Sequence, residues 1–423
     1  MNKIVRREYY AMDVVLVSPL CVSGGEHELT DADVMRDYEG TPFVPGTSLA
    51  GAFRNYLGKK KGEKSVFGYA KEKEGMMSSL YVSDMYFENV DGVKTSIRDG
   101  VRLGEDKIVL DGGKFDREIV ESGARGTIYI EAILRQNDTM DSVYAMIEQW
   151  AAAIQKGEIL FGGKKNRGFG RLKIHHFYTA SFGAEQKEKW LAFMEDWKKA
   201  IKNEEYLTDN WKDTDLSAKY VHISVPLKLT GGISIRRYST RPNGADYEHI
   251  TCNGVPVVPG SSWNGVIRQD IKTLLRDMGC NNAAFLLHTW FGFVDEKGGK
   301  KNAKQSEVVI AEGILENSVS IPMTRNKINR FSQATIDGAL YSEISYFGGT
   351  TRLEISVKKD ANKSYYALLG ALILAIKDIQ RGYVSVGGQT AIGRGIFAAE
   401  QEIIWSEEIA EEECMTALYA VME

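Results

Sequence analysis

Cysteines are few in this 423-residue sequence, and a long apolar segment is missing. The four cysteines are scattered and form no CxxC pair, which argues against a disulfide framework or a cysteine zinc site. No apolar run approaches the roughly 20 residues of a membrane span, and the first residues lack the apolar core of a secretory signal. We therefore expect a protein of the reducing cytoplasm, without a membrane partner.

The surplus of basic residues that nucleic-acid-binding proteins usually have is also missing. The sequence holds 53 Lys and Arg against 57 Asp and Glu, which gives a net charge of -4. The acidic residues gather at 184–215 and 402–413, whereas the glycine-rich loops carry basic residues. Because the location of charge matters more than its sum, this distribution is compatible with RNA binding.

Four of the only eight prolines lie in two related segments, PFVPGTSLAGAFR at 42–54 and PVVPGSSWNGVIR at 256–268. Their shared pattern is P-x-V-P-G-[ST]-S-x-x-G-x-x-R. Further matches occur in the same order in both halves. A double glycine precedes each of these segments, and a Phe-Gly pair, an Asp-Gly pair and a second double glycine follow it. A repeat of this length predicts two whole domains rather than a solenoid.

Each copy has the coarse order strand, helix, strand, strand, helix, strand, which is the ferredoxin-like order. We predict an α+β fold of two tandem ferredoxin-like domains, similar to RNA-recognition motifs, with inserted loops. The first domain is expected at 1–182 and the second at 219–423. Residues 183–218 begin with apolar residues at helical spacing and become polar, so a helix and linker are expected there.

The PG[ST]S turn has a mechanical interpretation. Proline and glycine set the turn, a Ser or Thr side chain is expected to cap the helix that follows, and the free N–H groups of that helix suit a phosphate. An arginine two turns along could reach an RNA backbone. The alternative is a purely structural turn with a solvated arginine. The candidate RNA contacts are Gly46, Thr47, Ser48 and Arg54 in the first copy and Gly260, Ser261, Ser262 and Arg268 in the second.

Two glycine-rich loops, at 162–171 and 387–395, are the next candidates, because glycine lets a backbone approach a ligand closely. The first loop is basic, which suits RNA phosphates, and the second keeps one arginine. A tight hairpin without a ligand is the alternative. The candidate RNA contacts are Gly163, Lys164, Lys165, Arg167, Arg171, Gly388 and Arg394, together with Arg236 and Arg237 in the first loop of the second copy.

The order of these motifs resembles the RAMP superfamily of CRISPR-associated proteins, over nearly the whole chain and twice. The motifs are most similar to those of the backbone subunits of type III effector complexes, and two copies in one chain resemble the fused arrangement of the type III-D group. The resemblance implies a subunit that binds a CRISPR guide RNA, a complementary target RNA and other subunits. Each domain would insert a thumb hairpin into the guide–target duplex.

The resemblance also implies a catalytic aspartate in the loop before the PG[ST]S turn. Asp31 matches best, because the segment from Asp31 to Asp37 reproduces the family's D-x-x-V-x-[KR]-D pattern. Asp33 is the alternative. In the second copy Asp246 is the only aspartate of the loop, and the pattern around it is lost. Target cleavage would use Mg²⁺ or another divalent cation, for which the sequence shows no ligand motif.

Two other functions stay open at this point. The chain could be a structural backbone subunit that binds guide RNA and neighbouring subunits without cutting. It could also be a ribonuclease that processes guide precursors, for which His27 is the only candidate general base near the first strand. The duplicated backbone-type motif argues against the second possibility.

Overall fold

The computed structural model describes residues 3–24, 30–58, 66–71, 74–88, 93–104, 109–136, 140–214, 219–238, 244–293, 303–360 and 362–422. The chain divides into two compact units. The first unit comprises Met1–Lys165 and Phe169–Ser217, and the second comprises Asn166–Gly168 and Ala218–Glu423. Among the described helices, none is long and apolar enough to cross a membrane.

The first unit is built on a four-stranded antiparallel sheet with the strand order β10-β1-β9-β5. These strands are β1 (Ile4–Leu16), β5 (Leu80–Val82), β9 (Arg125–Arg135) and β10 (Leu172–Gly183). Helix α1 (Gly46–Leu57) lies between β1 and β5 in the chain, and α3 (Met140–Lys156) connects β9 to β10. In order of appearance the strands are therefore arranged 4-1-3-2, which is the ferredoxin-like topology.

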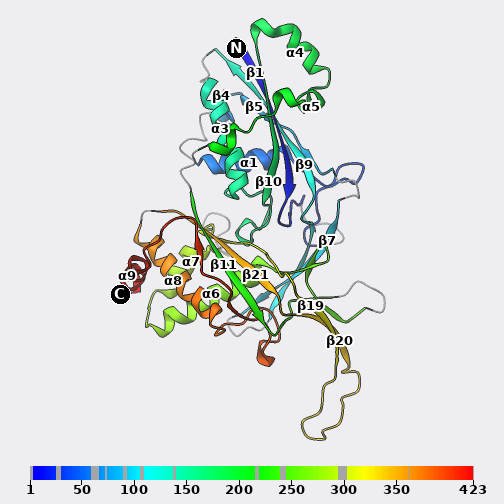
Figure 1. Cartoon of the computed structure of the whole chain (residues 1–423), viewed down its shortest axis with the longest axis vertical. Coiled ribbons are helices and arrows are strands. Elements are labelled where there is room, and N and C mark those ends of the chain that lie inside the picture. The colour runs from blue at the N-terminus through cyan, green and yellow to red at the C-terminus, as the bar shows by residue number, and fades with distance from the viewer. Residues whose placement is uncertain are drawn as a thin grey trace. The chain divides into compact units, whose positions relative to one another are not determined.

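Both faces of this sheet are covered (Figure 1). Alternate residues of β1, such as Tyr10 and Met12, pack on the core with α1 and α3. Their neighbours Tyr9 and Ala11 point to the other face, as side chains of a strand alternate, and pack under α4 (Lys187–Met194) and α5 (Trp197–Ala200). A strand covered on both faces reads as a continuous apolar run, and Tyr9 to Met12 are fully buried.

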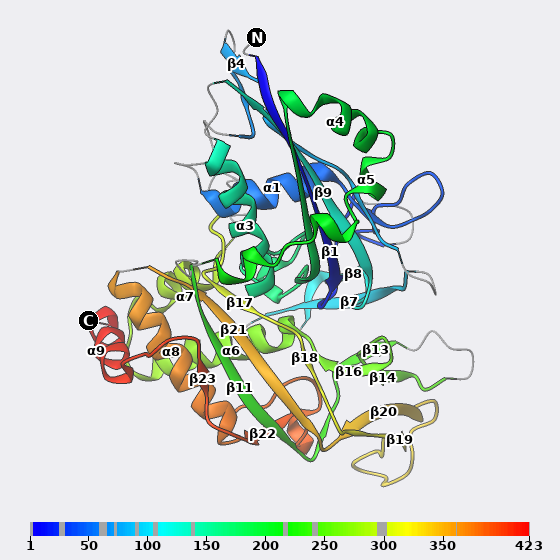
Figure 2. The same ribbon diagram turned by 45° about the horizontal axis from the view of Figure 1, so that its top comes forward.

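The second unit repeats the topology, with the sheet order β17-β21-β11-β22. Its strands are β11 (Tyr220–Thr230), β17 (Val308–Ile310), β21 (Thr350–Lys358) and β22 (Ile396–Ala399), with helices α6 (Gly260–Asp277) and α8 (Lys363–Gln380) in the equivalent places. The apolar side of β11 packs on these helices (Figure 2). The other side is polar, with Ser224 bonded to Glu354 of β21 at 2.6 Å. The prediction of two tandem ferredoxin-like domains is confirmed.

Each domain carries an inserted β-hairpin at the same point, between the second and third strands of the sheet. In the first domain it is formed by β7 (Thr95–Leu103) and β8 (Val109–Val120). In the second it is formed by β19 (Val319–Arg325) and β20 (Tyr341–Phe347), and it extends away from its own sheet (Figure 1). These hairpins occupy the place of the expected thumbs.

The other elements in the described parts of the chain include short strands and the helices α7 and α9. Helix α7 (Ala283–Phe291) follows α6, and α9 (Glu411–Met422) packs on α8 near the end of the chain. The other strands are β2 (Phe43–Val44), β3 (Tyr69–Lys71), β4 (Glu74–Met76), β6 (Met85–Tyr86), β12 (Gly232–Ile233), β13 (Arg236–Tyr238), β14 (Tyr247–His249), β15 (Thr251–Cys252), β16 (Val255–Val258), β18 (Gly313–Ile314) and β23 (Ile404–Trp405).

The predicted Ser/Thr caps of the two PG[ST]S helices are wrong. Helix α1 begins at Gly46, directly after Pro45, so Thr47 and Ser48 already lie inside the first turn and no side-chain cap forms. Helix α6 likewise begins after Pro259 without a side-chain cap. In the first domain the Gly46 N–H instead donates to the carboxylate of Asp84 at 2.7 Å.

Candidate functional site

The loop aspartate of the first domain is held by the inserted hairpin. The Asp31 N–H donates to Oδ1 of Asp116 on β8 at 3.1 Å, and the Asp116 N–H donates to Oδ2 of Asp31 at 3.0 Å. Neither bond uses Oδ1 of Asp31, and the residue is exposed. This reciprocal pair of bonds, which we call the aspartate clasp, fixes one carboxylate oxygen of an exposed residue.

The residues after Asp31 run along β8 and anchor the clasp. Glu118 accepts the Val34 N–H at 3.0 Å and a bidentate ion pair from Arg36, whose guanidinium lies 2.6 and 2.7 Å from the two carboxylate oxygens. Bonding to Arg36 lowers the pKa of Glu118, so this pair is ionised at neutral pH. The alternative aspartate, Asp33, instead accepts the Thr30 hydroxyl within its own turn at 2.5 Å.

The second domain forms the same clasp with a different partner. The Asp246 N–H donates to Oγ of Ser342 on β20 at 3.1 Å, and the backbone N–H and hydroxyl of Ser342 donate to Oδ2 of Asp246 at 2.7 and 3.0 Å. Because these hydrogen bonds favour the charged form, they hold the pKa of Asp246 below its ordinary value. Asp246 is therefore ionised at neutral pH. The structure thus places Asp31 and Asp246, which the sequence had matched only loosely, in equivalent positions.

His249 explains why the loop pattern of the second domain is hard to read. In both domains the residue three positions after the aspartate is buried, and it is Val34 in the first domain and His249 in the second. His249 Nδ1 accepts the Ile235 N–H and Nε2 lies 3.0 Å from the Val257 carbonyl. The D-x-x-V pattern is therefore kept in space as D-x-x-H. Sequence reasoning missed this residue because a polar histidine does not match the apolar valine of the D-x-x-V pattern.

The predicted basic contacts of the second domain are partly engaged by acidic side chains. Arg236 donates to Oε2 of Glu343 at 3.0 Å, and Arg237 lies 3.5 Å from Glu248. Glu343 of β20 is 1% exposed and also pairs with Arg325 of β19 at 2.8 Å. This buried carboxylate, which sequence reasoning did not single out, ties the first loop of the domain to the hairpin.

The glycine-rich loops are pinned in the same way in both domains. The Gly163 N–H donates to the Cys21 carbonyl at 2.7 Å, and the Gly388 N–H donates to the Ser234 carbonyl at 2.8 Å. A Cβ at Gly170 would lie 1.8 Å from the carbonyl oxygen of Phe161, and a Cβ at Gly395 would lie 1.9 Å from that of Val386. These glycines therefore serve the close packing of the loop against its own domain.

The basic residues of the loops differ in their surroundings. Lys164 is exposed and its ammonium lies 5.6 Å from the ring centre of Phe115 on the hairpin, whereas burial lowers the pKa of Lys165. Arg171 is half-buried, and Arg394 lies 4.3 Å over the ring of Phe347 on β20.

Arg167 belongs to the short segment that clusters with the second unit. Burial, together with the nearby charge of Arg268, lowers the pKa of Arg167 to about 10. Its buried Nη1 has no hydrogen-bond partner among the described residues. Two neighbouring guanidinium groups, one of them incompletely bonded, form a position that favours an anion.

The PG[ST]S turns are tightly packed at their glycines and open at the residues that follow. A Cβ on Gly46 would lie 2.2 Å from the Val82 carbonyl oxygen, and one on Gly260 would lie 2.2 Å from that of Ile310. In the same turns Thr47 and Ser261 are exposed, and Ser48 and Ser262 are half-buried. Of the two arginines, Arg54 is exposed and Arg268 is half-buried.

The donor atoms around the two clasps decide whether they suit Mg²⁺. In the first domain Asp116 is the carboxylate bonded to Asp31, and Asp99 lies opposite Asp116 in the hairpin register. In the second domain Thr324 lies opposite Ser342, so Asp246 is accompanied by hydroxyls. Over the part of the chain that is described, there is no group of three or more His, Cys, Asp or Glu that could hold a metal. The donors fit Mg²⁺ only in its common mode of one or two carboxylates plus substrate phosphates.

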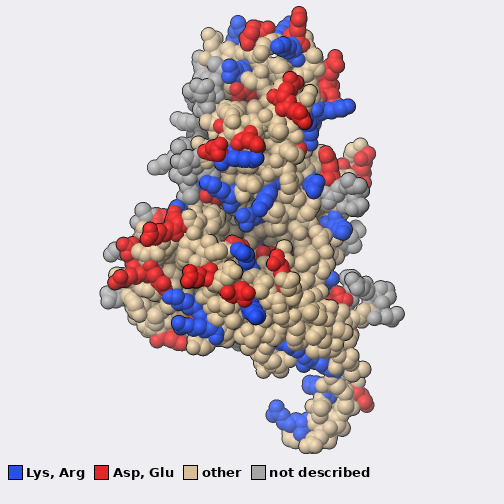
Figure 3. Space-filling model, viewed as in Figure 1, with Lys and Arg blue, Asp and Glu red and all other residues tan. Residues whose placement is uncertain are grey.

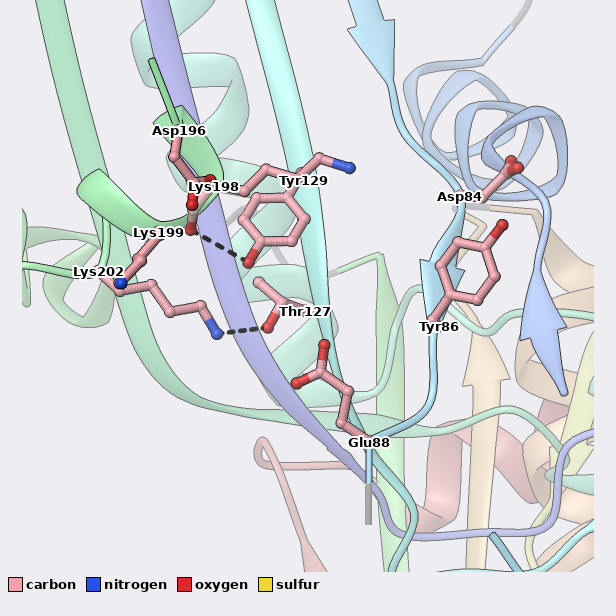
Figure 4. A pocket seen from close by; sticks show the side chains of 9 residues that line it. All are labelled: Asp84, Tyr86, Glu88, Thr127, Tyr129, Asp196, Lys198, Lys199 and Lys202. Carbon is pink, nitrogen blue, oxygen red and sulfur yellow. Dashed lines mark hydrogen bonds between the residues drawn. The ribbon is translucent and has the colours of Figure 1, made fainter. Parts of the chain in front are cut away.

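A separate pocket of about 380 Å³ lies on the surface of the first domain (Figure 4). Three lysines and three acidic residues line it, so its charges nearly balance. Lys202 is already engaged, because its ammonium donates to Asp13 and to Thr127 at 2.7 Å each. We assign this pocket no part in RNA binding.

The surface of the second domain separates its charges (Figure 3). Acidic side chains gather over the end that carries α9, where Glu411, Glu412 and Glu413 open the helix. Basic side chains lie along the β19–β20 hairpin, which holds Arg325, Lys327 and Arg330. Phe331 of the same hairpin is 96% exposed. The hairpin is therefore the more favourable end of this domain for a polyanion.

The fold and the repeated clasp define a protein of two tandem ferredoxin-like domains, each with a loop aspartate bonded to an inserted hairpin. The family model of the RAMP superfamily matches residues 13–173 and 221–398, which is one match in each domain. The chain therefore belongs to the RAMP superfamily. No curated protein matches the sequence. The resemblance to the RAMP superfamily is confirmed, and it supports an RNA-binding, CRISPR-associated role.

Proposed function

We propose that the chain is a guide-RNA-binding backbone subunit of a type III CRISPR effector complex, with two domains fused as in the type III-D group, and that it cleaves target RNA at Asp31 and Asp246. The observation that carries the proposal is the repeated clasp. The two domains have different loop sequences, and each holds an exposed aspartate by reciprocal bonds to the equivalent strand of its own hairpin, β8 or β20. A loop carboxylate without a role has no need of such fixation in both copies.

RNA binding is supported by the positions that surround the clasps. The exposed Arg54, the adjacent Arg167 and Arg268, and the basic β19–β20 hairpin can each contact phosphates without reading sequence. The sequence of the target would then be read by base pairing with the guide, as in other RNA-guided proteins. Neighbouring subunits of the complex would complete the RNA-binding surface.

The chemistry requires little more than position. The 2′-hydroxyl of the target attacks the adjacent phosphate, so that the 2′-O–P bond forms and the P–O5′ bond breaks. The 2′-hydroxyl loses its proton and the leaving 5′-oxygen gains one, which yields a 2′,3′-cyclic phosphate and a 5′-hydroxyl. Holding the attacking oxygen in line supplies much of such a rate enhancement. The carboxylate of each clasp would orient this hydroxyl or accept its proton.

Asp31 and Asp246 are the residues that would hold a divalent cation, together with phosphates of the bound RNA. When bound, Mg²⁺ would neutralise the charge that develops on the phosphate oxygens.

The test is a cleavage assay on the assembled complex. The chain would be co-expressed with its genomic neighbours, and labelled complementary RNA with Mg²⁺ would be given to the wild type, Asp31→Ala and Asp246→Ala. We expect each variant to lose one cut by roughly 10²-fold or more, with guide RNA still bound. The products should carry cyclic phosphate ends.

A scaffold without nuclease activity is the second candidate. It is favoured by the lack of a three-ligand metal cluster among the described residues. Intact target with all three proteins, while guide RNA still co-purifies, would establish it. The precursor-processing alternative rested on His27, which lies outside the described residues, and cleavage of free precursor RNA by the purified chain would support it.

A further inference from the structure

We infer that Asp116 and Ser342 are positioning residues, which hold the loop aspartates of the two domains in their cleaving orientation. The inference rests on the proposed function, and it adds two residues that sequence reasoning did not select. Asp116 and Ser342 lie at the same place on equivalent hairpin strands, β8 and β20.

Each positioning residue uses both its backbone and its side chain. In the first domain the backbone N–H of Asp116 donates to the Asp31 carboxylate, while the Asp116 carboxylate accepts the Asp31 N–H. In the second domain the Ser342 N–H donates to the Asp246 carboxylate, while the Ser342 hydroxyl accepts the Asp246 N–H. In both domains the side chain of the positioning residue therefore fixes the backbone of the loop aspartate, and its main chain fixes the aspartate carboxylate, which in the second domain also accepts the Ser342 hydroxyl.

The two side chains share one property, an oxygen that accepts the N–H of the loop aspartate. They differ in charge, since one is a carboxylate and the other a hydroxyl. An acceptor is therefore the common requirement, and negative charge is not. This predicts that an uncharged acceptor can replace Asp116, whereas a residue without an acceptor cannot.

The experiment uses the assembled, guide-loaded complex under single-turnover conditions, with the two cuts measured separately. Asp116→Ala should slow the first cut about ten- to hundredfold and leave the second unchanged, because a small misplacement of a catalytic group is enough for such a loss. Asp116→Asn and Asp116→Ser keep an acceptor and should cut at close to the wild-type rate. Ser342→Ala should slow only the second cut, and Ser342→Thr should restore it.

The matched control is Asp111→Ala, which removes an exposed carboxylate from the same strand. It should change neither cut. Target affinity, measured with a non-cleavable RNA, should stay constant in all these variants, because positioning changes the rate and not the binding.

Several outcomes would overturn the inference. An unchanged first cut in Asp116→Ala would remove the positioning role. Loss of both cuts, or of guide RNA, would show a general effect on folding. Equal damage by Asp116→Asn and Asp116→Ala would mean that the charge acts directly. These results are distinguishable from failure of the proposed function, in which the wild type leaves the target uncut or Asp31→Ala and Asp246→Ala leave both cuts unchanged.

Discussion

His249 occupies the place that Val34 has in the first domain, and it makes the second domain sensitive to acid. The ring is 1% exposed and bonded at both nitrogens to backbone groups, which is possible only in the neutral form. Burial lowers its pKa from 6.5 to about 4. The unfolded chain therefore protonates His249 below about pH 6.5, whereas the folded domain protonates it only near pH 4.

This shift predicts how the free energy of unfolding of the second domain depends on pH. The free energy of unfolding is highest above pH 6.5, where His249 is neutral in both states. It falls as the pH decreases toward 4, by about 2 kcal/mol at pH 5 and about 3 kcal/mol at pH 4. His249→Val should remove this dependence, since valine does not titrate. Urea unfolding at pH 7 and pH 5, followed by hydrogen exchange in the second domain, measures the difference.

His249→Val also lowers the free energy of unfolding at neutral pH. Valine leaves the Ile235 N–H and the Val257 carbonyl without their bonds to the ring, so the domain should be less stable at pH 7 by roughly 1–3 kcal/mol. The control is Val34→His in the first domain, where valine makes no side-chain bonds like those of the His249 ring to the backbone. If wild type and His249→Val lose the same stability between pH 7 and pH 5, another group is responsible.

At the level of elements, the two PG[ST]S helices depend on their first residue. Gly46 starts α1 against the Val82 carbonyl, and Gly260 starts α6 against the Ile310 carbonyl. Gly51 and Gly265, one and a half turns further along, face open space. The same residue type therefore has opposite roles within one helix.

We predict that Gly46→Ala destabilises the first domain by about 1–3 kcal/mol, because its methyl group has no room beside a backbone oxygen. Gly51→Ala, the matched control, should stabilise α1 by roughly 0.5–1 kcal/mol, since alanine favours a helix and meets no neighbour. Urea unfolding of the two variants measures both effects. Equal stability of the two variants would mean that the close contact at Gly46 relaxes without cost.

At the level of the whole molecule, RNA binding is expected from local basic sites on an acidic chain. Arg54→Ala and Arg268→Ala should each weaken guide binding and reduce the slope of log affinity against log salt by about one, as expected for a lost phosphate contact. Arg276→Ala is the control, because Arg276 lies exposed in the last turn of α6 beside Asp277. Filter binding of synthetic guide RNA at several salt concentrations measures these slopes. A changed intercept with an unchanged slope would exclude a phosphate contact.

The architecture could be predicted from the sequence because the repeat preserves the order of its motifs. The Asp31 loop was recognisable because its pattern is local. The partners Asp116 and Ser342 were not, since their contacts with the loops join residues 85 and 96 positions apart. The absence of a Ser/Thr cap was missed because Pro45, and not Thr47, takes the N-cap position, so α1 begins two residues earlier than the pattern suggests.

The presence of two clasps in one polypeptide has a practical consequence. Asp31 and Asp246 are produced in a fixed one-to-one ratio and, under the proposed function, share one guide and meet the same target molecule. The proposed function therefore predicts a ratio of the two cleavage products that is independent of protein concentration, active fraction and guide loading. Any substitution in one clasp can be read against the other as an internal standard within a single reaction.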